Sequence, residues 1–185
     1  MRAALRIIFV TCTLLTGCAS SAEQSRQETG GVINFVDAKE GLRIVYPGDW
    51  KEQTYLKPRG AIVILEMPRR SDSKLPGTLS VVAQDPSIPV SSADLPAMET
   101  RLIDKAQNTV GNFQLVETSD TTLGSEPARR IIYTGTKLGM SLRVMNVITA
   151  HNGRGYAIAF MSAPEAFDET RPEVDKVVKS FEFLR

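Results

Sequence analysis

The stretch that decides the fold is SLRVMNVITAHNGRGYAIAFMS, residues 141–162. At its centre, Asn152-Gly153 is a strong signal for a tight turn, so the stretch predicts an antiparallel hairpin of residues 141–150 and 156–162. Successive side chains of a strand point to opposite faces. One face of the first strand carries Leu142, Val144, Asn146 and Ile148, and the other carries Arg143, Met145 and Val147. Apolar residues on both faces predict a central strand of the sheet.

Further strands are expected before this hairpin. Two short apolar runs, 33–36 and 42–46, surround a turn at 37–41 and predict a second hairpin. Residues 61–67 form a β-branched run, which is typical of a strand buried on both faces. Other strands are expected at 78–84, 113–121 and 128–136.

Two helices are predicted among these strands. Asp94 is suited to cap a helix that runs to about Val110 and packs on a sheet through apolar residues at helical spacing. The segment from Pro164 predicts a second helix, with a break near Arg171-Pro172. Its expected buried side is Val174, Val177, Val178 and Phe181. This order of elements predicts an α+β fold, an α/β/α sandwich on a largely antiparallel β-sheet.

The N-terminus resembles the signal of a bacterial lipoprotein. Arg2 and Arg6 accompany an apolar run at 7–15, which is shorter than the roughly 20 residues that span a bilayer. Leu15-Thr16-Gly17-Cys18 then resembles a lipobox, and it fits this pattern better than the alternative, an ordinary secretory cleavage site. Cleavage before Cys18 and its acylation are expected to anchor the chain to a membrane, because two acyl chains bind stably. In a Gram-negative cell, Ala19 in place of an aspartate favours the outer membrane, facing the periplasm.

We therefore expect three segments. Residues 1–17 are the lipoprotein signal peptide, residues 18–31 are the acylated Cys18 and a flexible tether, and residues 32–185 are one domain. Fully extended, the thirteen tether residues after Cys18 reach roughly 45 Å.

Charge and cysteine content exclude several function classes. The chain has 22 basic and 21 acidic residues, and loss of Arg2 and Arg6 leaves 20 against 21, a net charge of −1. This balance gives no electrostatic reason to expect nucleic acid as a partner. Cys12 leaves with the signal and Cys18 is acylated, so no disulfide or thiol chemistry is expected.

Three phrases of the sequence are similar to PsbP-like domains. Gly41-Leu-Arg-Ile-Val-Tyr-Pro-Gly-Asp-Trp50 resembles their opening strand and turn, Glu126-Pro-Ala-Arg-Arg-Ile-Ile-Tyr133 their middle segment, and Lys179-Ser-Phe-Glu-Phe183 their ending. The resemblance covers about residues 32–185. The wider group includes Mog-type Ran-binding proteins and bacterial DcrB-like lipoproteins, and it implies an α/β/α sandwich used mostly for docking. No calcium, chloride or Ran-contact residue is carried over, because no matching site motif is present.

Candidate reactive residues are few. His151, the one histidine, has no second His or free Cys as a partner for a metal and is expected in an exposed turn. Gly139-Met-Ser-Leu-Arg143 departs from the nucleophile-elbow pattern at its last position, and Gly153-Arg-Gly155 lacks the third glycine of a dinucleotide motif. A solvated helix accounts for the carboxylates Asp168, Glu169, Glu173 and Asp175, and a solvated loop for the cations Arg69, Arg70 and Lys74. Trp50 is expected at the edge of the core rather than as an interface anchor.

These observations predict a membrane-anchored, non-enzymatic lipoprotein that binds or scaffolds an envelope protein or complex. No catalytic residue, cofactor or metal is expected, and Cys18 is the one assigned site. The alternative is a carrier of a small apolar ligand or lipid in a pocket between sheet and helix. An enzyme of unrecognised type is a third hypothesis, and it requires polar groups that converge in one cleft.

Overall fold

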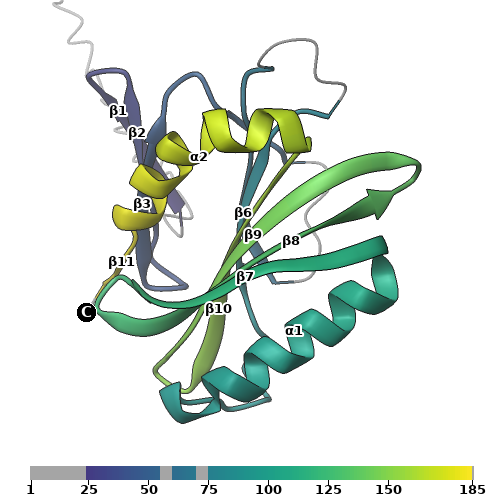
Figure 1. Cartoon of the computed structure of the whole chain (residues 1–185). Helices are drawn as coiled ribbons and strands as arrows, with labels where there is room; N and C mark the ends of the chain where they lie inside the picture. Colours follow the sequence, from purple (N-terminus) through teal and green to yellow (C-terminus); the bar gives the residue numbers. More distant parts are fainter. Residues whose placement is uncertain (1–23, 55–59, 70–74, 185) are drawn as a thin grey trace, which may run out of the picture.

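Figure 1 shows the computed structural model, which describes residues 24–54, 60–69 and 75–184. Its strands form two sheets, and all paired strands are antiparallel. The small sheet has the order β1-β2-β3-β11 and the large sheet the order β4-β5-β6-β10-β9-β8-β7. The small sheet comprises β1 (Gln24–Thr29), β2 (Val32–Asp37), β3 (Leu42–Pro47) and β11 (Glu182–Phe183). The large sheet comprises β4 (Lys51–Glu52), β5 (Ala61–Glu66), β6 (Thr78–Ala83), β7 (Gly111–Leu123), β8 (Glu126–Lys137), β9 (Met140–His151) and β10 (Arg154–Ser162).

The predicted central hairpin is confirmed. β9 pairs with β10 through a turn in which Asn152 and Gly153 both have positive φ, 47° and 77°, as a tight hairpin turn requires. β9 is the fifth of the seven strands of its sheet and is buried on both faces. Met145 and Val147 point into one hydrophobic core, whereas Leu142, Val144 and Ile148 point into the other. The alternation in the sequence therefore assigned the two faces correctly.

Helix α1 (Leu95–Thr109) covers one part of one face of the large sheet. It follows a short 3-10 turn at Ser92–Asp94, and the Asp94 carboxylate accepts hydrogen bonds from the backbone N–H and hydroxyl of Ser91. The helix packs over β7, β8 and β9, where Leu102 and Ala106 meet Ile131 and Val144. The predicted helix and its packing on the sheet are confirmed, and α1 begins directly after Asp94. The Asp94 side chain, however, caps no N–H group of α1, because it is bonded to Ser91.

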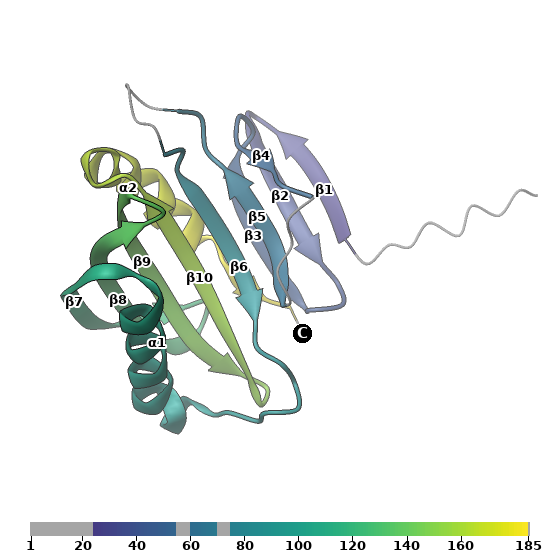
Figure 2. The same cartoon turned by 90° about the vertical axis from the view of Figure 1, so that its right-hand side faces the viewer.

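Helix α2 (Pro164–Lys179) and the small sheet together cover the opposite face (Figure 2). The main core lies between these layers and includes Phe35, Phe160, Phe167 and Phe181, all fully buried. The α+β class and the sandwich are thus confirmed. The small sheet beside α2 is a feature that the sequence reading did not anticipate.

The predicted break in the second helix is wrong, because α2 continues through Pro172. Proline inside a helix costs about 3 kcal/mol, since it removes one hydrogen bond and crowds the preceding turn. Val174, Val177 and Val178 are buried in the main core just after it, and each contributes about 1.5–3 kcal/mol. This burial offsets the cost of the proline.

The predicted tether is also too long. Residues 24–29 form β1, which pairs with β2 along its whole length from Gln24–Asp37 to Thr29–Val32. Arg26 of β1 forms an ion pair with Glu52 of β4 and lies over the Phe35 ring, 5.0 Å from its centroid. The polar composition of this segment hid a strand whose stability depends on its neighbours. Residues 18–23 of the proposed tether lie outside the described residues.

Candidate functional site

An open groove lies where α1 leaves the large sheet uncovered. Because α1 packs over β7, β8 and β9, the sheet surface of β6 and β10 beside it stays partly exposed. The groove has a volume of about 310 Å³. Val82, Ile148 and Ala157 contribute apolar surface from three neighbouring strands, while Met98 and Arg101 line it from α1. The arrangement presents apolar surface with one cation beside it.

Gly155 shapes one end of this groove. A Cβ atom at this position would lie 2.6 Å from Oε1 of Gln84 and 3.1 Å from Cε of Met98. The glycine therefore allows the Gln84 amide and the Met98 thioether to lie close to the backbone of β10. A larger residue would have to displace both side chains, so Gly155 controls the shape of the groove.

His151 lies at the seam between the two sheets and is not the exposed turn residue that was expected. Its ring stacks on Phe183 of β11, with centroids 3.9 Å apart and planes 9° apart. Nε2 lies 3.0 Å from the Asn152 amide nitrogen, which donates to it, so Nδ1 carries the proton and donates to Oε1 of Glu126 at 2.8 Å. The side chain is 21% exposed. These contacts give the histidine a structural role, because they join β8, β9 and β11.

Arg154 extends this seam on the neighbouring strand. Its guanidinium forms an ion pair with Glu40 in the turn between β2 and β3, and its Nε donates to the carbonyl oxygen of Gln84 at 2.7 Å. Burial raises the pKa of the Tyr156 hydroxyl, and the Tyr156 ring lies under the Arg154 guanidinium and edge-on to the ring of Phe183. The Gly153-Arg-Gly155 segment thus serves a hairpin turn and a contact between sheets.

Two carboxylates of α2, Asp168 and Asp175, form ion pairs with different arginines of the large sheet. Asp168 pairs with Arg143 at 3.2 Å, and the Arg143 guanidinium lies 4.6 Å from the centroid of the Phe167 ring. Asp175 lies 3.8 Å from Arg130, beside a small cavity of about 190 Å³. Within the described ranges, no three His, Cys, Asp or Glu side chains gather as a group that could hold a metal ion.

Some of the remaining candidate residues from the sequence lie within the described structure, and others lie outside it. Trp50 is 4% exposed within the main core, which confirms its structural interpretation. Arg69 is exposed, whereas Arg70 and Lys74 lie outside the described residues, as does Cys18. Ser141 lies in the regular strand β9 directly after the turn at Gly139, so this segment is no nucleophile elbow. The sequence suggested a pocket between sheet and helix but not the residues that line this groove, because they come from β6, α1 and the β9–β10 hairpin, which are separated along the chain.

No helix in the described part of the chain combines the length and the apolar character needed to cross a membrane. No functionally curated protein matches the sequence. Several solved structures have a similar fold, among them the following three. The cyanobacterial PsbP (CyanoP) of Synechocystis sp. PCC 6803 has 16% identity and a TM-score of 0.61, with coverage of 84% of this chain and 94% of that chain.

The second is LpqN, described as involved in cell envelope biogenesis of Mycobacterium tuberculosis. It has 15% identity and a TM-score of 0.57, with coverage of 88% of this chain and 91% of its own. The third, PA94 of Pseudomonas aeruginosa, is a protein of unknown function with 11% identity and a TM-score of 0.51, covering 83% and 92%. At the level of sequence families, the model of the PsbP-like proteins matches residues 4–183. The chain therefore belongs to the PsbP-like protein family.

Proposed function

We propose that this protein is a membrane-anchored, non-enzymatic lipoprotein that binds or scaffolds an envelope protein or complex. The observation that carries the proposal is Leu15-Thr16-Gly17-Cys18 at the end of a short apolar segment, followed by a domain that begins at Gln24. Acylation of Cys18 would hold this domain at a membrane surface. The description of LpqN, which shares the fold, supports a role in the cell envelope.

The packing of the domain supports binding rather than catalysis. The histidine is held between Phe183 and Glu126, and Asp168 and Asp175 face arginines of the sheet. General acid–base chemistry requires polar groups that converge on a space for a substrate. The groove beside α1 instead offers mainly apolar side chains. A partner is the simplest occupant of such a surface.

The short connection to the anchor determines how the domain acts. Six peptide units join Cys18 to Gln24, and they span at most about 22 Å. The domain therefore works at the membrane surface. With Ala19 after the cysteine, we propose the outer membrane, facing the periplasm, as its location in a Gram-negative cell.

Substitution of Cys18 tests the anchor. The Cys18→Ala precursor is expected to stay unlipidated, to lose incorporation of labelled palmitate and to leave the membrane fraction. Substitution of Cys12, which lies within the signal, is the matched control and should leave labelling of the mature protein unchanged. Undiminished membrane association and labelling of the Cys18→Ala protein would contradict the proposal. Turnover of an envelope substrate that is lost on substitution of a groove residue would contradict its non-enzymatic part.

A second candidate is a carrier of a small apolar ligand, and the groove is the observation that favours it. Ligand pockets usually measure about 300–1,000 Å³ and enclose most of the ligand, so a groove of about 310 Å³ is at the lower limit. Organic extraction of the purified protein followed by mass spectrometry tests this candidate. A stoichiometric apolar compound that is lost in Ala157→Phe, which fills the groove, would support a carrier; an empty extract would remove it.

A further inference from the structure

The sheets of this domain end in edges of very different length. Three edge strands are short: β1 has six residues, and β4 and β11 have two each. The fourth edge is β7, with thirteen residues, and it lies in front of β8 and β9 in Figure 1. A free edge strand presents unpaired N–H and C=O groups and is a template for pairing with another strand. β7 is therefore the main free edge of the described structure.

The side chains of β7 provide only part of the protection that a long edge usually carries. Proteins protect long edges with lysine, proline or inward-pointing charges, yet residues 111–123 contain no lysine and no proline. Leu115 and Val116 are 47% and 50% exposed, and Leu138 at the nearby hairpin turn is 89% exposed. The bulges of β7 lie before Glu117. From Glu117 to Leu123 the strand pairs residue by residue with β8, so this half is regular enough to accept another strand.

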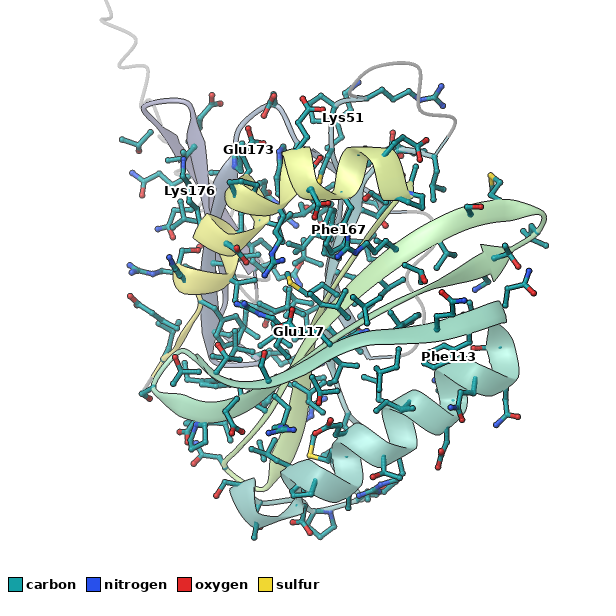
Figure 3. All side chains as sticks on the ribbon, viewed as in Figure 1. Lys51, Phe113, Glu117, Phe167, Glu173 and Lys176 are labelled. Atoms are coloured by element: carbon teal, nitrogen blue, oxygen red, sulfur yellow. The ribbon has the colours of Figure 1, made fainter. Side chains whose placement is uncertain are left out.

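One of the two carboxylates on this half of β7, that of Asp120, is paired with a cation. Asp120 forms an ion pair with Arg129 at 2.5 Å, and Arg129 also contacts Glu99 of α1 at 2.6 Å. Glu117 accepts a hydrogen bond from the Ser119 hydroxyl at 3.0 Å. The labelled side chains of Phe113 and Glu117 indicate the course of the strand in Figure 3. Apart from Asp120, residues 118–122 carry hydroxyl side chains.

We infer that two copies of this chain pair through β7, antiparallel about a two-fold axis at Ser119, and thereby join their large sheets. In this register, Thr118 faces Asp120 of the other copy, and Glu117 faces its Thr121. Each carboxylate then meets a hydroxyl rather than another carboxylate, and cross-strand pairs of this kind stabilise antiparallel sheets. The regular pairing then runs from Glu117 to Thr121, and Val116 and Leu115 lie beyond it at the bulge. One patch pairs with itself, as a two-fold interface requires.

The position of the anchor leaves this interface accessible. β1, where the connection to Cys18 begins, and β7 lie on opposite sides of the molecule in Figure 2. β1 is held to β4 by Arg26 and Glu52, and β4 is six strand spacings, about 29 Å, from β7. Two paired copies would carry their anchors at the two outer sides. This step rests on the proposed lipid anchor, which would also concentrate the chains in one membrane.

A single cysteine at the axis tests the pairing in the full-length protein in its membrane. Opposed residues of antiparallel strands have Cα atoms about 4.5–5.5 Å apart, within the range that a disulfide bridges. Ser119→Cys is therefore expected to form a disulfide-linked dimer on a non-reducing gel. Gln27→Cys, an exposed position of edge strand β1, is the matched control, and at least about tenfold less dimer is expected from it.

A second substitution tests whether the crosslink reports specific pairing. Val116→Lys adds a protective charge to the edge, and in the Ser119→Cys protein it should reduce the dimer to the level of the control. Equal dimer from Ser119→Cys and Gln27→Cys, or a dimer that persists with Val116→Lys, would overturn the inference. Wild type reports on the anchor separately, because a disulfide dimer through Cys18 means that this thiol is not acylated. In that event, Ser119→Cys and Gln27→Cys are compared in the Cys18→Ala background. The protein concentration is then raised, because the membrane no longer concentrates the chains.

Discussion

The strands β1 and β7 are both edges, but the chain treats them in opposite ways. β1 is short, polar and held down by Arg26, which reaches Glu52 and covers the Phe35 ring. β7 is twice as long, rests on β8 and α1, and exposes Leu115 and Val116. Side-chain contacts thus hold β1, the strand next to the proposed anchor, whereas β7, on the far side of the molecule, has a free outer edge in the described structure.

This difference indicates which edge of the domain can pair with another strand. A polar strand with charged residues discourages pairing, since an incoming strand would have to desolvate those charges. β7 carries two charged residues, Glu117 and Asp120, among thirteen, whereas β1 carries two among six, so pairing along β7 has a smaller desolvation cost per residue. The contrast agrees with the proposed attachment on the β1 side and the proposed association on the β7 side.

The largest expected effect comes from the core below β1. Phe35→Ala removes a fully buried ring from the main core and is expected to lower the free energy of unfolding by about 3–5 kcal/mol. Phe113→Ala is the matched control on β7, where the ring is half-buried against Tyr133, and it should cost about 1 kcal/mol. Urea denaturation measures both values. Equal losses would show that the two edges rest on equally important cores.

An intermediate effect is expected at the seam that holds the two sheets, and hence the two edges, together. His151→Ala removes the stack on Phe183 and the hydrogen bond to Glu126, for a loss of about 1–2 kcal/mol in unfolding free energy. His151→Phe retains the stack and should lose about half as much. Faster hydrogen exchange of the β11 amides in the alanine variant alone would support the stack. Identical exchange in both variants would assign the stability to the hydrogen bond instead.

The smallest effect is expected from Arg26→Gln, because the arginine side chain is 38% exposed and its ion pair is screened by solvent. We expect a loss of less than about 1 kcal/mol in the free energy of unfolding, together with faster hydrogen exchange of the β1 amides. Gln27→Ala on the same strand is the control and should leave exchange unchanged. If Arg26→Gln behaves like this control, then β1 is held by backbone pairing alone and the contrast with β7 weakens.

Much of the fold could be predicted because local patterns and burial agree. The alternation of side chains in residues 142–148 predicted a strand buried on both faces, and the Asn-Gly turn predicted the hairpin. β1 escaped prediction because its residues, QSRQET, carry no apolar period. The same holds for His151: its role depends on Phe183, which lies 32 positions later and meets it only through the pairing of β11 with β3.

By itself the sequence determined the α+β class, the central hairpin, the first helix and a lipobox-like segment, since each is a local pattern of charge, apolar period or turn residues. The tertiary structure alone decided that a second sheet shares a face with α2, that the connection to Cys18 is short, and that β7 is an edge strand of the large sheet among the described residues. The physical reason is that an edge is defined by the absence of a neighbour. No local run of residues encodes which strand, among those distant along the chain, will have none.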